Sequence, residues 1–167
     1  MAIMTDSKGN IFRQFIRIHE EQLDASALDA PLTHALIVAE YEGKCLFLYS
    51  KWNRCWELPG GVIEEGETAR QCVIRELREE TNQRLADGDV SFLGLMKFRL
   101  QPSYHGPERT EYGALFKGRI DRLEAFTEND EASSIMLWDG VSDAGEEPIA
   151  EIDKKLLDYR YGQREEA

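Results

Sequence analysis

The stretch from Gly60 to Gln83, with the sequence GGVIEEGETARQCVIRELREETNQ, constrains the fold and the chemistry of this chain more than any other. Thr68 can cap the N-terminus of a helix, and Gln71, three residues later, can complete a capping box. Glu67 places a negative charge at the positive end of that helix. The sequence therefore predicts a loop that passes into a helix near Thr68.

The predicted helix places acidic side chains beside apolar ones. At about 100° per residue, one side of the helix is apolar and consists of Ala69, Val73, Ile74 and Leu77. Glu76 and Glu80, four residues apart, project within about 20° of Ala69, at the margin of this side. Glu79 lies one step further round, so the three carboxylates share one ridge.

The helix alone leaves two interpretations of this ridge open. Crowded carboxylates repel one another unless a cation neutralises them, which favours a site for a hard cation of the Mg²⁺ type. The alternative is a solvated surface helix held by pairs such as Arg75 with Glu79. The preceding Pro59-Gly60-Gly61 favours the cation site, because glycines let backbone carbonyls approach a bound ion or phosphate closely.

These residues resemble the signature box of the Nudix hydrolase superfamily, which includes MutT-like proteins. The matching positions are Gly61, Glu67, Arg75-Glu76-Leu77 and Glu79-Glu80, preceded by Trp56-Glu57-Leu58-Pro59-Gly60. The box ends differently, because Asn82 and Gln83 stand where the family usually has Gly and an aliphatic residue. We expect Asn82 to cap the helix, since Asn tolerates a left-handed conformation. We expect Gln83 to loosen the local packing, with Leu85 as a substitute.

The resemblance implies a divalent cofactor, Mg²⁺ or Mn²⁺, bound by the box. The implied ligands are the main-chain carbonyl of Gly60 and the carboxylates of Glu76, Glu79 and Glu80. Glu76 and Glu80 form the best pair, because residues four apart on a helix project side by side. Glu79 either binds a further ion or takes the proton from the attacking water.

Other residues receive roles by the same resemblance. Arg75 is expected on the solvent side of the ridge, where it orients a glutamate rather than the substrate. Gly61 keeps the loop close to the helix, and Glu67 belongs to the structural part of the box. A loop carboxylate often joins the metal or acts as the base in this family, and Glu131 is the preferred candidate, with Glu128 in reserve. A solvated acidic loop is the alternative.

Composition predicts one globular domain over residues 11–161, with a loose segment at 1–10 and a frayed tail at 162–167. The formal charge of −12 argues against a surface for nucleic-acid polymers, whereas small anionic nucleotides stay compatible if metal ions bridge them. The three cysteines are expected to be reduced core thiols rather than thiolate nucleophiles. We expect a cytoplasmic protein with no membrane segment, and the sequence leaves a homodimer open.

The order of elements predicts an α+β fold that resembles the Nudix α/β/α sandwich, with a mixed sheet and the box as a loop-helix-loop. Residues 11–19 read as a strand or a short helix. Residues 34–41 and 44–49 form a hairpin, 90–100 and 110–120 an antiparallel pair, and a further strand ends near Trp138. Residues 149–161 have the apolar spacing of a closing helix.

Two regions outside the box are candidates for binding the substrate. The long loop 101–109 carries Tyr104, His105 and Arg109, which could contact a base, ribose or phosphate, although an exposed loop without a role is the alternative. Trp52 or Trp56 could stack on a nucleobase, but we favour a buried structural role for them.

The resemblance implies hydrolysis of a nucleoside diphosphate linked to another moiety. Our first prediction is a nucleoside triphosphate pyrophosphohydrolase, with oxidised nucleotides as candidate substrates. ADP-ribose or another sugar nucleotide is second, since the Pro and Tyr markers of those subfamilies are not met cleanly after the box. A non-catalytic nucleotide-binding domain is disfavoured, because all the glutamates of the box are present.

Overall fold

The structure, a computed structural model, describes residues 1–23, 27–103 and 105–161 of the 167-residue chain. The helices and strands along the described chain are β1 (Met4–Thr5), β2 (Ile11–Ile16), η1 (Glu20–Gln22), β3 (Leu32–Tyr41), β4 (Lys44–Ser50), β5 (Cys55–Glu57), β6 (Gly60–Val62), α1 (Ala69–Thr81), η3 (Asp87–Asp89), β7 (Val90–Leu100), β8 (Arg109–Arg119), β9 (Ala132–Trp138), α2 (Glu151–Leu156) and η4 (Leu157–Tyr159). No helix in these ranges is long and apolar enough to cross a membrane.

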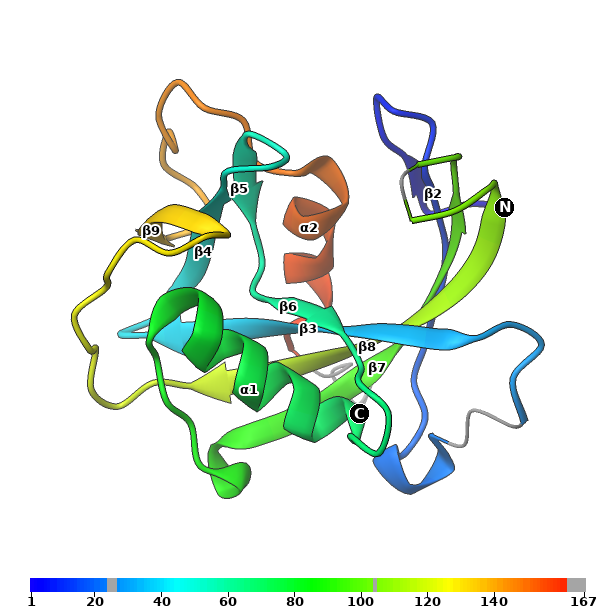
Figure 1. Ribbon diagram of the computed structural model, residues 1–167, viewed down its shortest axis with the longest axis horizontal. Helices are drawn as coiled ribbons and strands as arrows, with labels where there is room; N and C mark the ends of the chain where they lie inside the picture. Colours follow the sequence, from blue (N-terminus) through cyan, green and yellow to red (C-terminus); the bar gives the residue numbers. More distant parts are fainter. Residues whose placement is uncertain (24–26, 104, 162–167) are drawn as a thin grey trace, which may run out of the picture.

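Strand β3 lies at the centre of the described sheet (Figure 1). It pairs in parallel with β8 and antiparallel with β6, which carries the glycines of the box. It pairs with β4 only beside the hairpin turn, after which β4 pairs with β5 and β9. Glu42 and Gly43 have φ angles of 50° and 80°, the left-handed backbone that the predicted two-residue turn requires. The sheet is therefore mixed, and β3 joins the box to β8.

Helices cover both faces of the sheet. Successive side chains of β3 point to opposite faces, so each face can pack against a different helix. Ala35, Ile37 and Ala39 belong to one apolar cluster, which also contains Val73 and Leu77 of α1. Val38 belongs to a second cluster, with Leu156 of α2 and Leu157 of η4. Figure 1 shows α1 and α2 on opposite sides of β3. The predicted layered α+β fold is confirmed.

Three elements differ in detail from the sequence prediction. Residues 11–16 form a strand, so the helical alternative is wrong. Within the segment expected to be loose, Met4 and Thr5 pair with β2, because an edge strand gains backbone hydrogen bonds that sequence composition does not reveal. The closing helix is shorter than residues 149–161, since α2 passes into a 3₁₀ turn at Leu157. Residues 162–167, expected to fray, lie outside the described residues.

Both predicted caps of α1 are present. The backbone N–H of Gln71 donates to the Thr68 side chain, and the Gln71 side chain accepts from the Thr68 N–H, which completes the capping box. Asn82 ends the helix with a φ of 62°, and its N–H donates to the Arg78 carbonyl. The start and end of α1 therefore follow from local sequence.

Gln83 does not loosen the packing, and that prediction is wrong. Its side chain is fully buried. Its amide nitrogen donates to the carbonyls of Thr81 (3.0 Å) and Glu124 (2.9 Å), and its amide oxygen accepts from the Glu124 N–H at 2.8 Å. Leu85 is also buried, beside it rather than in its place. The amide thus joins the end of α1 to the segment that leads toward β9.

We predict that Gln83→Ala lowers the free energy of unfolding by about 1–3 kcal/mol, because two backbone groups of Glu124 lose their buried partner. Gln83→Leu should also destabilise the protein, although it supplies the aliphatic residue usual in the family. Urea unfolding monitored by circular dichroism measures both changes, with the exposed Arg84→Ala as control. A Gln83→Leu variant as stable as the wild type would contradict the hydrogen-bonding role.

Candidate active site

The glycines of the box let its loop lie against β3 and α1. Gly60 pairs with Leu36 of β3, and a Cβ at Gly60 would lie 2.2 Å from the carbonyl oxygen of Ala35. A Cβ at Gly61 would lie 2.7 Å from Oε1 of Glu76. Any larger side chain would push the loop away from the strand or from the glutamate. Both glycines therefore fix the distance between the loop and the carboxylates.

Glu80 is a buried carboxylate in direct contact with this loop. Its side chain accepts a hydrogen bond of 2.9 Å from the Gly60 N–H, and the residue is only 6% exposed. Burial raises the pKa of Glu80 to about 9, although the Gly60 hydrogen bond opposes the rise. The charges of Glu76 and Glu131 raise it further. No cationic side chain of the described chain pairs with Glu80, so its charge has no compensation from the protein.

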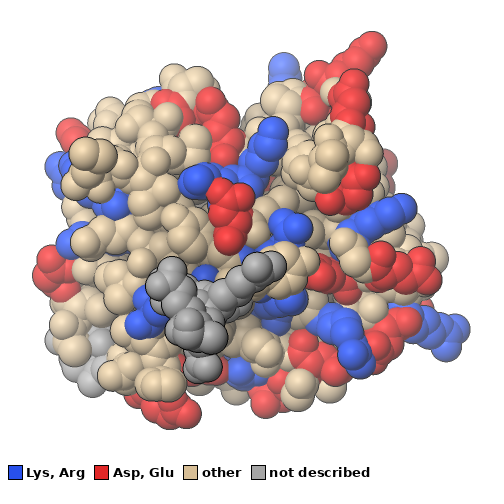
Figure 2. All heavy atoms as spheres, turned by 180° about the vertical axis from the view of Figure 1, so that it is seen from behind, with Lys and Arg blue, Asp and Glu red and all other residues tan. Residues whose placement is uncertain are grey.

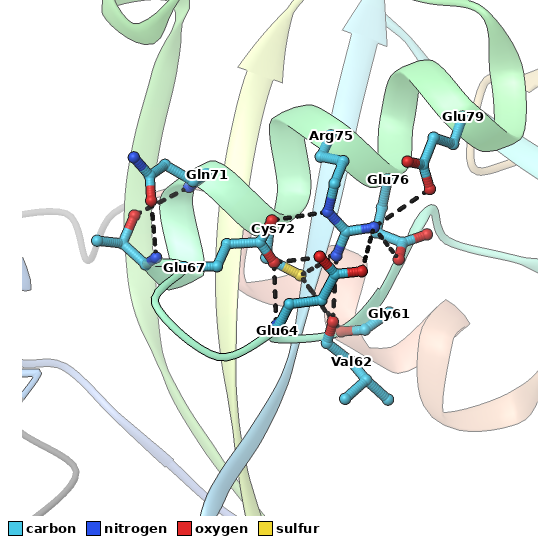
Figure 3. A network of polar contacts seen from close by, with 10 residues as sticks. Gly61, Val62, Glu64, Glu67, Gln71, Cys72, Arg75, Glu76 and Glu79 are labelled. Atoms are coloured by element: carbon cyan, nitrogen blue, oxygen red, sulfur yellow. Dashed lines mark hydrogen bonds and ion pairs between the residues drawn. The ribbon is translucent and has the colours of Figure 1, made fainter.

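Arg75 stands at the centre of a carboxylate network on the same ridge (Figure 3). Its guanidinium contacts Glu67 at 2.6 Å, Glu76 at 2.8 Å and Glu79 at 3.2 Å. The Arg75 hydrogen bond lowers the pKa of Glu67, which therefore stays ionised. The Arg75 side chain is 19% exposed, so it is more covered than the sequence led us to expect. These contacts agree with a role in orienting glutamates.

Glu76 and Glu79 have different surroundings on the ridge. Burial raises the pKa of Glu76, and Arg75 opposes this rise. The Glu79 side chain is 54% exposed, and among the described residues Arg75 is the one side chain that pairs with it. The structure therefore brings Glu76 and Glu80 together beside the glycine loop and leaves Glu79 at its outer edge.

The residues present fit a hard divalent cation. Glu80 is a buried carboxyl group that no cationic side chain of the described residues pairs with, and Glu76 lies close enough to raise its pKa. The glycine backbone beside them can supply a carbonyl oxygen, and carboxylate and carbonyl oxygens suit Mg²⁺ and Mn²⁺. No group of three acidic, His or Cys side chains forms a ready ligand cluster in the described residues. Two carboxylates and backbone oxygen are therefore the donors that this geometry offers a cation, and the ligand set stays a prediction.

The loop before β9 lies near this ridge. The charge of Glu131 raises the pKa of both Glu76 and Glu80. Asn129, which the sequence analysis did not single out, donates from its side-chain amide to the carbonyl of Glu80 at 2.9 Å. Glu128, the reserve candidate, instead pairs with Lys51 at 2.8 Å. The geometry favours Glu131 over Glu128 as an additional carboxylate, and its role stays a prediction.

Two further acids lie behind the loop, and sequence reasoning missed both. Oδ2 of Asp153, in α2, accepts from the Leu58 N–H at 2.9 Å. Oε1 of Glu57 accepts from Asn53 Nδ2 at 2.6 Å. Burial raises the pKa of Asp153 to about 7, and the charge of Glu57 adds to the rise. Glu57 could have been found from its place just before the box, whereas Asp153 lies in an acidic segment without a motif.

The cysteines are poor candidates for nucleophiles. All three are free, and Cys45 and Cys72 are buried. Burial raises the pKa of Cys55 and Cys72 to about 12, so their thiolate fraction at neutral pH is small. These values agree with the expectation of unreactive thiols.

The predicted substrate loop 101–109 connects β7 to β8. Tyr104 lies outside the described residues, and His105 is exposed. Arg109 donates from Nε to Glu111 at 2.6 Å, so its guanidinium is engaged within β8. Nη1 of Arg109 also donates to the carbonyl of Pro107 at 3.0 Å. A role in substrate binding stays a prediction.

The two tryptophans of the preceding segment differ from each other. Trp56 packs edge-on against Tyr49, with ring centroids 5.3 Å apart, and joins the cluster beneath α2. Trp52 is 76% exposed, so the structural interpretation is wrong for this residue. It lies on the turn between β4 and β5, where no core is available to cover it.

Comparisons with known proteins agree with this geometry. A family model described as the NUDIX domain matches residues 31–159. The MutT-like protein of Streptomyces ambofaciens is 30% identical over 131 residues, which cover 72% of this chain and 83% of that protein. The RNA pyrophosphohydrolase of Legionella pneumophila (strain Corby) is 44% identical over 83 residues, 43% of this chain and 46% of the other.

Solved structures show the same fold. The crystal structure of the Bacillus subtilis pyrophosphohydrolase BsRppH superposes with a TM-score of 0.65 at 21% identity, covering 84% of this chain and 79% of that one. The family match spans most of the chain, and the box glutamates and glycines stand together in the fold. The chain therefore belongs to the NUDIX family and is an enzyme that hydrolyses pyrophosphate bonds.

Proposed function

We propose that this enzyme is a nucleoside triphosphate pyrophosphohydrolase that depends on Mg²⁺ or Mn²⁺, with oxidised nucleotides among its candidate substrates. The observation that carries the metal site is the buried Glu80 carboxylate, held by Gly60 and without a protein cation. A divalent ion bound there would supply the opposite charge that keeps this carboxylate ionised at neutral pH.

The carboxylates of Glu76 and Glu80, with the main-chain carbonyl of Gly60, would hold the cation. A divalent ion bound there supplies charge that screens the phosphoryl oxygens and lowers the pKa of an attacking water. Arg75 restrains Glu76 through the contact at 2.8 Å, which fixes the direction of that carboxylate. Glu79 is exposed enough to reach a proton or a further ion.

The charge distribution argues for small nucleotides over polymers. The formal net charge is −12, and acidic and basic side chains are interspersed on the face shown in Figure 2. A polymer surface gathers Lys and Arg so that many phosphates are neutralised together. The relative from Legionella pneumophila acts on RNA by its name, so a triphosphorylated RNA 5′ end is the alternative that an assay must include.

The first test is chromatographic identification of the products formed from a substrate panel, with and without Mg²⁺ or Mn²⁺. The panel contains ordinary and oxidised nucleoside triphosphates, ADP-ribose, another sugar nucleotide and a short triphosphorylated RNA. We expect metal-dependent release of pyrophosphate from triphosphates. Glu80→Gln should lower kcat by on the order of a hundredfold or more, because the variant keeps the shape but removes the charge.

Glu65→Gln is the matched control, since it makes the same change at an exposed position of the box loop. Full activity of Glu80→Gln at saturating metal would reject the assigned metal site. Faster turnover of ADP-ribose or of RNA would replace the proposed substrate class. Binding of nucleotides without any hydrolysis would favour the non-catalytic alternative.

The surroundings of Glu80 also predict how the stability of the metal-free protein depends on pH. Because the folded-state pKa of Glu80 is raised to about 9, the folded protein binds more protons than the unfolded chain between about pH 5 and 9. The free energy of unfolding should therefore fall as pH rises through this window, by up to about 1.4 kcal/mol per pH unit for one fully buried group.

Urea unfolding in EDTA from pH 6 to 8.5 measures this dependence. Glu80→Gln should flatten it and should be more stable than the wild type at pH 8.5, whereas Glu65→Gln should follow the wild type. Other groups titrate in the same range, so the difference between the wild type and Glu80→Gln is the quantity to compare. If the free energy of unfolding had the same pH dependence in both proteins, burial would not disfavour the ionised form of Glu80.

Glu131 is our candidate for the additional carboxylate. We predict that Glu131→Gln lowers kcat at least tenfold, in the range typical of a general base or an additional ligand, with little change in the fold. Glu128→Gln is the control from the same loop, because Glu128 pairs with Lys51 instead. Steady-state kinetics on the best substrate of the panel decides, and equal activities of the two variants would place the additional carboxylate elsewhere.

A further inference from the structure

The box loop is held by carboxylates from both helical layers. On one side, Glu80 of α1 accepts from the Gly60 N–H at 2.9 Å. On the other, Asp153 of α2 accepts from the Leu58 N–H at 2.9 Å, across 95 positions of sequence. Between them, the Pro59 carbonyl accepts from the Ile37 N–H of β3. Three successive residues of the loop are thus fixed to three different elements.

The start of α2 is tied to the same segment by backbone hydrogen bonds. The Trp56 N–H donates to the Pro148 carbonyl at 2.9 Å, and the Ala150 N–H donates to the Trp56 carbonyl at 2.8 Å. These bonds place the first turn of α2 directly beside residues 56–58. Asp153 therefore faces the loop from α2, whose start is held by the backbone of Trp56.

Burial and the charge of Glu57 both disfavour the ionised form of Asp153, so an aspartate at this position costs folding free energy. Its hydrogen bond to the Leu58 N–H is the interaction that can offset this cost. No ion pair to a cationic side chain is formed by Asp153 within the described ranges, and Glu57 adds a like charge nearby. Leu58 is only 3% exposed, so its N–H is buried and would lack a partner without Asp153. An apolar residue at position 153 would pack without the electrostatic cost but would leave that N–H unpaired.

We propose that Asp153 is a positioning residue for the metal site, acting through the Leu58 N–H to hold the backbone of Gly60 beside Glu80 and Glu76. This inference rests on the proposed metal site. Asp153 itself touches neither substrate nor cation in this role. It fixes the peptide that carries the predicted carbonyl ligand, as hydrogen-bonded partners do for metal ligands in general.

The test compares Asp153→Ala, which removes the acceptor, with Asp153→Asn, which keeps an amide oxygen at the same place. Asp158→Ala is the control, because Asp158 lies in η4, directly after α2, and pairs with Lys155 at 2.8 Å. Binding of Mn²⁺ alone, measured by electron paramagnetic resonance, is the first readout. We expect Asp153→Ala to weaken Mn²⁺ binding about tenfold, and Asp153→Asn and Asp158→Ala to stay within about threefold of the wild type.

Kinetics separates positioning from a general loss of structure. Asp153→Ala should lower kcat at saturating nucleotide with a smaller change in KM, while its thermal unfolding stays cooperative. Wild-type Mn²⁺ affinity in a folded Asp153→Ala variant would overturn the proposal. That result differs from a failure of the proposed function, in which Glu80→Gln would stay fully active or the wild type would need no metal.

A measurement on the wild type keeps the proposal testable if Asp153→Ala does not fold. Coupling between two sites is reciprocal, so Mg²⁺ should strengthen the hydrogen bond that favours its binding. Amide hydrogen exchange followed by NMR should show the Leu58 N–H protected and slowed several-fold further by saturating Mg²⁺. The Ile120 N–H, bonded to Glu40 at the other end of β3, is the internal reference. A Leu58 amide that exchanges freely, or that is slowed no more than Ile120, would overturn the proposal.

Discussion

The contact between the Glu80 carboxylate and the Gly60 N–H is the interaction on which the site depends. It joins the last turn of α1 to the glycine loop, and it brings a charge into a place that water barely reaches. A single N–H cannot offset the loss of hydration of a carboxylate, which is why burial raises the pKa of Glu80 to about 9. Among the described residues no cation compensates an ionised Glu80, which is the basis of the proposed metal site.

Arg75 divides the ridge into two electrostatic halves. It compensates Glu67, Glu76 and Glu79 through contacts of 2.6 to 3.2 Å, yet it does not reach Glu80. In the compensated half, Arg75 holds Glu67 and Glu76 in place by contacts that need no bound ion. The uncompensated half is where we propose that a cation binds. A second arginine near Glu80 would stabilise the metal-free protein but would compete with the ion for the same carboxylate.

The parts of the site that local sequence determines could be predicted. The caps of α1 and the shared ridge of Glu76 and Glu80 follow from spacing along one helix, and the structure has both caps. Gln83 could not be interpreted in this way, because its partners at Glu124 lie 41 residues away. The role of Asp153 could not be predicted for the same reason. It depends on the Leu58 N–H, which only the folded chain places beside the Asp153 carboxylate. Pairing across distant segments is set by the sheet, and no motif records it.

The central strand explains why these distant pairings converge. Gly60 of the loop and Leu115 of β8 both pair with Leu36 of β3, on its two sides, so the box loop and β8 share one strand as support. The alternation of β3 side chains then packs α1 on one face and α2 on the other. Because the loop pairs with β3 between the two helical layers, a carboxylate from each helix can reach the backbone of the loop. The position of the glycine loop is thus a property of the whole sandwich, and a change in α2 far along the chain can alter the box.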